Sequence, residues 1–177
     1  MINIGTKAPD FSNVEAYCKT CKEGFMKINL SDYKGKWLVF FFYPRDFTFI
    51  CPTELKGFSA AEAEFDKMGA KVLAASTDSA WSHKAWFERD LPDITYPILA
   101  DTNLHVARDY QVLNESNGDA ERGLFIIDPE GTVKYMLVSA GSVGRSVAET
   151  LRVLRALQSG ELCPVEWHAG EKTLGKA

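Results

Sequence analysis

The stretch WLVFFFYPRDFTFICPTELKGFSAAEAEFDKMG, residues 37–69, decides the fold of this chain. Its first seven residues are apolar and rich in aromatic types, which predicts a buried central strand at 37–43. A short polar and aromatic turn follows. Beyond it, helical spacing from Pro52 to Gly69 places apolar residues at Leu55, Phe58, Ala61, Phe65 and Met68. The stretch therefore predicts a strand, a turn and a helix, in that order.

Strands and helices continue to alternate along the rest of the chain. Apolar runs predict strands at 71–77, 96–101, 124–128 and 132–139. Helical spacing predicts helices at 78–90, at 103–110 and from Val147 to Gly160, the last one preceded by the capping pair Ser146 and Glu149. Residues 26–35 alternate apolar and polar types, whereas the residues before them and the segment 112–123 indicate a loop and a polar turn.

The turn Asp-Pro-Glu-Gly at 128–131 joins the last two strands, so these strands pair antiparallel. Earlier strands are separated by helices, which is typical of parallel pairing. The order of elements therefore predicts an α/β fold, a three-layer sandwich with a mixed central sheet flanked by helices.

The composition is that of one soluble globular domain. Of 177 residues, 46 % are hydrophobic and 25 % charged, and the net charge is −4. That balance lacks the basic footprint of nucleic-acid or anionic-membrane binding. No apolar stretch approaches the roughly 20 residues of a membrane span, and the amino terminus lacks the pattern of a secretory signal. We expect a cytoplasmic protein with no nucleic-acid or membrane partner.

The cysteines lie at positions 18, 21, 51 and 163, and only Cys18-Lys19-Thr20-Cys21 has the CxxC spacing. Cytosolic thiols are kept reduced, so cysteines there are more often catalytic, metal-binding or inert than structural. A structural zinc site usually needs a second such pair or two closely spaced histidines, and the histidines at 83, 105 and 168 are scattered. We expect no metal and no cofactor.

Cys51 has two interpretations. Cysteine often packs as a small hydrophobe, and the neighbouring Phe47 and Phe49 favour that interpretation. However, Pro52 suits the first position of a helix, which places Cys51 at or beside the helix cap, facing unpaired backbone N–H groups. The positive end of the helix dipole stabilises a thiolate there. This position, at the joint between strand and helix, favours a reactive cysteine.

The run PRDFTFICPTE resembles the active-site segment of peroxiredoxins, in which a proline, a threonine and a cysteine have the spacing of Pro44, Thr48 and Cys51. The resemblance extends through Ala8-Pro9-Asp10-Phe11, STDSAWSHKAW, ERGLFIID and GELCPVEW, and so covers nearly the whole chain. It is strongest to the alkyl hydroperoxide reductase C-type branch of typical two-cysteine peroxiredoxins. The resemblance implies a thioredoxin-like domain at 1–165 and a short carboxy-terminal tail at 166–177.

The resemblance also implies a thiol-specific peroxidase that reduces hydrogen peroxide and organic hydroperoxides. Cys51 would attack a peroxide oxygen as a thiolate and become a sulfenic acid. Thr48 and Arg122 would bind the peroxide oxygens, Pro44 would close the pocket against water, and Glu54 would orient Arg122. Arg45 is interpreted as a surface charge.

Cys163 resembles the resolving cysteine, which condenses with the sulfenic acid to a disulfide before overoxidation. In typical members this partner comes from the other subunit, which implies a homodimer, often assembled into a decamer. Electrons would come from a protein disulfide reductant, either thioredoxin-like or a dedicated flavoprotein reductase.

The chain departs from the family in its loop and tail and in its CxxC pair. The loop before Arg122 lacks the glycine-rich motif of easily overoxidised members, and the tail lacks their tyrosine–phenylalanine end. Both features indicate a bacterial-type enzyme in which the Cys51 region unfolds readily. The CxxC pair is also absent from typical members; Cys18 and Cys21 could be inert, could be a dithiol that relays electrons or forms a local disulfide, or could bind metal. Two alternative functions remain, a dithiol–disulfide oxidoreductase acting through this pair and a ring-shaped holdase chaperone.

Overall fold

The computed structural model describes residues 1–176 as two compact units, Met1–Arg145 and the residues from Ser146 onward. The strands of the first unit are β1 (Val14–Tyr17), β2 (Phe25–Ile28), β3 (Trp37–Phe42), β4 (Ala70–Ser76), β5 (Ile98–Ala100), β6 (Leu113–Asn114), β7 (Asp119–Ala120), β8 (Arg122–Ile127) and β9 (Val133–Ser139). Its helices are α1 (Cys51–Ala60), α2 (Glu62–Lys67), α3 (Ala80–Asp90) and α4 (His105–Asp109), with short 3-10 helices at Lys22–Gly24 and Leu30–Tyr33. The second unit contains α5 (Val147–Ser159). A domain boundary between residues 165 and 166 stays a prediction.

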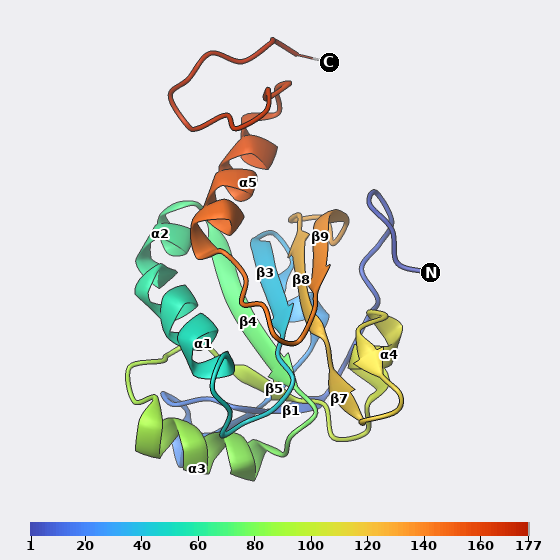
Figure 1. Ribbon diagram of the computed structural model, residues 1–177, viewed down its shortest axis with the longest axis vertical. Helices are drawn as coiled ribbons and strands as arrows, with labels where there is room; N and C mark the ends of the chain where they lie inside the picture. The colour runs from blue at the N-terminus through green and yellow to red at the C-terminus, as the bar shows by residue number, and fades with distance from the viewer. Residues whose placement is uncertain (177) are drawn as a thin grey trace. The chain divides into compact units, whose positions relative to one another are not determined.

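The first unit is built around a mixed sheet with the strand order β2-β1-β5-β4-β3-β8-β9. β3, β4 and β5 are parallel because helical segments return the chain between them, whereas β8 pairs antiparallel with β3 and β9 pairs antiparallel with β8. Figure 1 shows α1 and α2 on one side of this sheet and α4 on the other. The predicted α/β fold with a mixed sheet flanked by helices is therefore confirmed.

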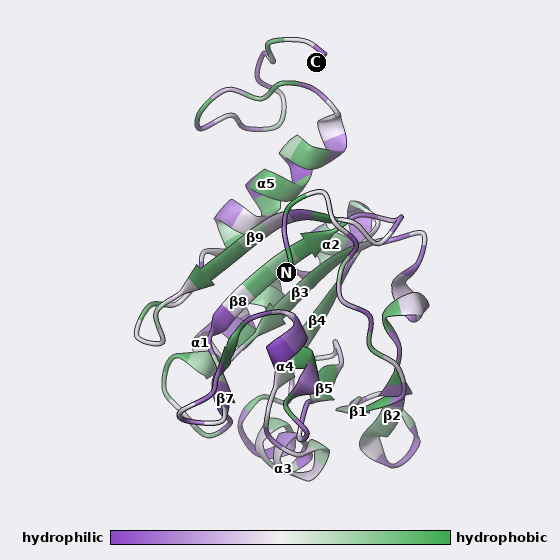
Figure 2. Cartoon of the chain, turned by 90° about the vertical axis from the view of Figure 1, so that its right-hand side faces the viewer, coloured by the Kyte–Doolittle hydropathy of each residue, from purple (hydrophilic) through white to green (hydrophobic). Residues whose placement is uncertain are grey.

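β3 is an interior strand of the sheet, between β4 and β8, and is buried on both faces. Phe40 and Phe42 join the core cluster that also contains Ala107 of α4. Phe41 faces the opposite side, where its ring stacks on that of Phe58 in α1 at a centroid distance of 4.4 Å. Since both faces are covered, the strand is a continuous apolar run rather than an alternating one, as the colouring of β3 in Figure 2 shows.

The β8–β9 hairpin forms as predicted and determines where Arg122 lies. Its turn is closed by a hydrogen bond from the Asp128 N–H to the Thr132 carbonyl at 2.9 Å, and Gly131 takes a φ of 79°, which glycine adopts without strain. Leu124 of β8 pairs with Phe41 of β3. Arg122, two residues earlier, therefore lies beside the carboxyl end of β3, where the chain leaves the sheet towards Cys51.

The single helix predicted from Pro52 to Gly69 is wrong: α1 and α2 are separate helices that meet at Ala61. The Ala61 N–H is shared between the carbonyls of Gly57 (3.3 Å) and Phe58 (3.2 Å), so the last turn of α1 tightens and the helix is interrupted. The apolar spacing continues across the joint, which is why the sequence pattern does not reveal the break.

The amino-terminal residues contain a strand that the sequence pattern did not predict. β1 pairs antiparallel with both β2 and β5, and its residues Val14, Ala16 and Tyr17 are buried. Four residues are too short for a clear period-two pattern, so only tertiary pairing identifies this strand. Residues 26–35 alternate apolar and polar types, but the strand there, β2, ends at Ile28. The turn predicted at 112–123 contains the small β6–β7 hairpin.

No helix within residues 1–176 is long and apolar enough to cross a membrane.

Candidate active site

Cys51 is the first residue of α1, directly after the loop that leaves β3. Ile50 is the N-cap and Pro52 is the second helical residue, so the cysteine lies inside the first turn, one position later than the proline pattern alone suggests. Its thiol is free, and the residue is 0 % exposed. The start of α1 thus holds a buried cysteine sulfur that forms no disulfide.

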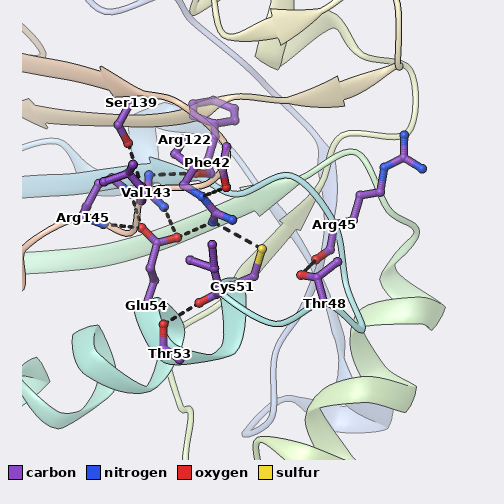
Figure 3. Close-up of polar contacts among 12 residues, drawn as sticks. Phe42, Arg45, Thr48, Cys51, Thr53, Glu54, Arg122, Ser139, Val143 and Arg145 are labelled. Atoms are coloured by element: carbon purple, nitrogen blue, oxygen red, sulfur yellow. Dashed lines mark hydrogen bonds and ion pairs between the residues drawn. The ribbon is translucent and has the colours of Figure 1, made fainter.

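Arg122 makes the contact that distinguishes Cys51 from an ordinary core cysteine. Its Nη1 lies 3.4 Å from the Cys51 Sγ and 2.6 Å from the Glu54 Oε2, while its Nε donates to the Gly141 carbonyl at 2.8 Å. Figure 3 shows the guanidinium between the sulfur and the carboxylate. Arg122 and Glu54 are 3 % and 4 % exposed. A buried cation is thereby fixed against the sulfur by a carboxylate one helical turn away.

Arg145 is a second buried arginine at this site that sequence reasoning missed. Its backbone N–H and its Nε both donate to the Glu54 Oε1, at 2.8 and 2.7 Å, and its Nη2 donates to Oε2 at 2.9 Å. Its Nη1 donates to the carbonyls of Phe42 and Gly123, which ties the group to β3 and β8. This arginine is isolated in the loop GSVGRS, just before a capping serine, and no spacing rule predicts from sequence that it belongs to the site.

The two arginines keep Glu54 ionised. Burial raises the pKa of a carboxyl group, but the hydrogen bonds and positive charge of Arg145, together with the charge of Arg122, outweigh that effect and hold the pKa of Glu54 below its usual value. One carboxylate therefore shares two guanidinium groups, and the cluster formed by Glu54, Arg122 and Arg145 carries a net positive charge next to the sulfur.

Pro44 and Thr48 line a pocket with Cys51 and Arg122, as the sequence predicts for a shared site. The Thr48 hydroxyl donates to the Arg45 carbonyl at 2.9 Å, so its lone pairs are left to accept a hydrogen bond from a bound group (Figure 3). The Arg45 side chain is half exposed and pairs with Asp119 at 2.9 Å, consistent with a surface charge.

A buried hydrogen-bonded group fixes the loop that carries Thr48. The Tyr43 hydroxyl donates to the Asp46 Oδ1 at 2.8 Å, and the Asp46 Oδ2 contacts the His83 Nδ1 at 2.9 Å and accepts from the Ser82 hydroxyl at 2.7 Å. Burial, reinforced by the negative charge of Asp46, raises the pKa of Tyr43 well above its ordinary value, so its hydroxyl stays a donor. The loop is thus anchored to α3 from beneath.

The other cysteines are not among the residues that line this pocket. Cys163 belongs to the second unit, is free and partly exposed, and has its Sγ 3.4 Å from the Ser159 hydroxyl. Cys18 and Cys21 are joined by a disulfide, which selects the local disulfide among the three possibilities for this pair. Within residues 1–176 no group of three or more His, Cys, Asp or Glu side chains is arranged to hold a metal ion.

Comparisons with known proteins agree with this geometry. Residues 4–136 match the model of the AhpC/TSA family. A putative peroxiredoxin encoded in the rubredoxin operon of Clostridium pasteurianum is 47 % identical over 176 residues, which cover 97 % of this chain and 98 % of that protein. The crystal structure of reduced Plasmodium vivax 2-Cys peroxiredoxin has a TM-score of 0.90 at 33 % identity and covers 96 % of this chain and 91 % of its own. Enterococcus faecalis AhpC has a TM-score of 0.86 at 37 % identity and covers 93 % of this chain and 100 % of its own. The thioredoxin-like fold is thereby confirmed.

Proposed function

Because this chain belongs to the AhpC/TSA family and is a peroxiredoxin, a thiol-dependent peroxidase, we propose that Cys51 reacts with the peroxide and that Cys163 resolves the product. One observation carries the first assignment: the Arg122 Nη1 is 3.4 Å from the sulfur of a free, buried cysteine at a helix start. A buried guanidinium at this distance can donate a hydrogen bond to the sulfur and to an oxygen bound next to it.

The Cys51 thiolate attacks the terminal oxygen of a hydroperoxide. The oxygen–oxygen bond breaks, the sulfur takes up that oxygen as a sulfenic acid, and the rest leaves as water or an alcohol after taking a proton. A thiol of pKa about 8.5 is a few per cent ionised at pH 7, so full ionisation gains at most about thirtyfold. The larger share of the acceleration has to come from groups that stabilise the transition state.

Arg122 supplies that stabilisation. Its guanidinium is held by the Glu54 carboxylate and the Gly141 carbonyl, so it needs little reorganisation when charge develops on the departing oxygen. Glu54 is a positioning residue here, since it acts through Arg122. Arg145 supports the same carboxylate from its other side.

Thr48 and Pro44 complete the peroxide pocket. The Thr48 O–H donates to the Arg45 carbonyl, so the Thr48 oxygen is free to accept a hydrogen bond from the peroxide O–H. That bond aligns the oxygen–oxygen bond of the peroxide with the sulfur. Pro44 contributes an apolar wall without an N–H group that would attract water.

Cys163 then attacks the sulfenic sulfur of Cys51, and the oxygen leaves as water while a Cys51–Cys163 disulfide forms. The Cys51 sulfur is fully buried in the reduced chain, so this step requires the loop at residues 44–50 and the start of α1 to open. We infer that Cys163 comes from a second subunit of a homodimer, that such dimers assemble into a decamer, and that the enzyme works in the cytoplasm. A protein disulfide reductant, thioredoxin-like or a dedicated flavoprotein reductase, regenerates the dithiol.

The test is peroxide consumption with a thiol reductant by Cys51→Ser and Cys163→Ser variants, followed by non-reducing mass spectrometry after one equivalent of peroxide. We expect Cys51→Ser to be inactive and Cys163→Ser to accumulate sulfenic acid at wild-type rate. The assignment of Cys51 fails if its serine variant still consumes peroxide. The assignment of Cys163 fails if the wild-type product lacks an intersubunit Cys51–Cys163 link.

A further inference from the structure

The Cys18–Cys21 disulfide takes no part in the chemistry described above. We propose that it is a second redox centre, a thiol–disulfide exchange site for a dithiol protein with an acidic and apolar docking face. The exchange involves neither Cys51 nor Cys163, so it stands or falls independently of the peroxidase assignment.

The disulfide is poorly suited to a structural role. It closes a loop of only four residues, and the conformational entropy that a crosslink removes from the unfolded chain grows with loop length. The loop is also held without it. The Cys18 N–H donates to the Gly24 carbonyl at 3.0 Å, the Cys21 N–H to the Cys18 carbonyl at 3.1 Å, and the Gly24 N–H to the Cys21 carbonyl at 3.1 Å.

Those same hydrogen bonds make the redox change reversible. They involve only the backbone, so they persist when the sulfur–sulfur bond opens, and the two thiols remain within reach of each other. Two contacts with the rest of the chain reinforce this arrangement: the Lys84 Nζ, from α3, donates to the Glu23 carbonyl at 2.9 Å, and the Lys19 Nζ, within the loop, donates to the Pro92 carbonyl.

The two sulfurs differ in access, and this sets the direction of attack. Cys18 is 6 % exposed, whereas Cys21 is half-buried. An incoming thiolate therefore reaches the Cys21 Sγ, and Cys18 is the leaving group. The Thr20 hydroxyl lies 3.6 Å from the Cys18 Sγ and can donate to the thiolate that forms there.

An aromatic and cationic surface lies beside the disulfide. The rings of Phe25 and Trp81 are 4.6 Å apart, and Trp81 is 67 % exposed. The Lys84 Nζ lies 5.2 Å from the Phe25 ring and 5.9 Å from the Trp81 ring. Lys19 and Lys22 are exposed in the same loop. The neighbouring carboxylates are Glu23 in the loop and Glu88, whose Oε1 lies 4.0 Å from the Lys84 Nζ, so three lysines face two glutamates. On a chain with a net charge of −4, this slight local excess of positive charge favours a partner with acidic groups around an apolar patch.

The reaction is a balanced two-electron exchange. The partner's thiolate attacks the Cys21 Sγ, the bond to the Cys18 Sγ breaks, and the electron pair remains on Cys18, which takes a proton. The partner's second thiolate then attacks the partner's first sulfur and releases Cys21 as a thiolate, which is protonated in turn. Cys18 and Cys21 end as a dithiol and the partner ends as a disulfide.

The test uses the full chain with Cys51→Ser and Cys163→Ser, so that Cys18 and Cys21 are the only cysteines whose redox state is measured. Purified reduced thioredoxin serves as the dithiol-protein probe and dithiothreitol as the small-molecule probe, and reduction is followed by alkylation and mass spectrometry. We expect both to reduce the disulfide in the folded protein, and thioredoxin to do so at least about tenfold faster at equal thiol concentration.

Surface variants separate docking from chemistry. Trp81→Ala and Lys22→Glu, the latter at an exposed loop residue, should slow reduction by thioredoxin about tenfold or more and leave reduction by dithiothreitol unchanged, since only the protein uses the surface. Lys36→Glu makes the same charge change at an exposed residue outside the loop and α3, and should react at the starting rate.

A structural disulfide would behave differently. If excess dithiothreitol reduces the bond only when the chain is unfolded, or if Cys18→Ser with Cys21→Ser lowers the melting temperature by more than about 5 °C, the redox role is overturned. Equal thioredoxin rates for Trp81→Ala, Lys22→Glu and Lys36→Glu would overturn the docking surface.

Discussion

The Arg122 Nη1 lies 2.6 Å from the Glu54 Oε2, and both side chains are buried almost completely. The same nitrogen contacts the Cys51 sulfur. A buried ion pair contributes little net stability, but removing one partner leaves an uncompensated buried charge. The position of the cation at the sulfur therefore depends on a carboxylate that does not itself touch the sulfur.

Glu54→Gln keeps the size of the side chain and removes its charge. We expect the free energy of unfolding to fall by about 3–5 kcal/mol, because two buried guanidinium groups lose their counter-ion. We also expect kcat/KM for peroxide to fall by about a hundredfold, since Arg122 is no longer held in line. Urea unfolding and peroxide consumption measure the two effects, and Glu149→Gln, which breaks the partly exposed pair with Arg152, is the matched control. A wild-type kcat/KM in Glu54→Gln would contradict the positioning role.

The same carboxylate should make stability depend on pH in the acid range. The pKa of Glu54 is lowered in the folded chain, so its contribution is fully present above the unfolded-chain pKa, near 4.5, and is lost as the pH falls through the lower folded value. We expect the urea midpoint of the wild-type chain to fall more steeply below about pH 4.5 than that of Glu54→Gln. If the urea midpoints of the two proteins fall in parallel from about pH 6 to about pH 3, Glu54 does not cause this pH dependence.

Arg122 and Arg145 share Glu54 but differ in their other contacts, so lysine variants should separate them. Arg122→Lys loses the contact with the sulfur and should lower kcat/KM by about a hundredfold or more, the usual cost of one transition-state donor. Arg145→Lys loses the bonds to the Phe42 and Gly123 carbonyls and should mainly reduce stability, by about 2 kcal/mol. Peroxide kinetics and urea unfolding of both variants check the separation. Equal losses of kcat/KM in Arg122→Lys and Arg145→Lys would contradict this separation of roles.

Thr48 tests the peroxide pocket directly. Thr48→Ser retains a hydroxyl that can donate to the Arg45 carbonyl and accept from the peroxide, so we expect kcat/KM within about threefold of the wild type. Thr48→Val keeps the shape but cannot accept, and should lose about a hundredfold. The rate of Cys51 alkylation by a small neutral reagent should change far less than the peroxide rate in Thr48→Val. A parallel loss of both rates would mean that the variant acts on the sulfur and not on the peroxide.

The sequence alone determined the central strand, the α/β class and the hairpin, because a strand covered on both faces needs a continuous apolar run and a tight turn needs its Asp, Pro and Gly residues. Local order also placed Cys51 at a helix start and Glu54 in its first turn, and these features depend on residues close together in the chain. Thr48 and Arg122 were proposed only through the resemblance to peroxiredoxins.

Tertiary structure alone decided three other points. β1 is recognisable only by its pairing with β2 and β5, because four residues carry too little periodicity. Arg145 joins Glu54 from 91 positions away, where no spacing rule applies. Cys18 and Cys21 could have been inert, metal-bound or linked, and only the fold of their loop selects the disulfide. Long-range pairing of charges and short strands is absent from local sequence patterns, because it arises from the way the sheet brings distant segments together.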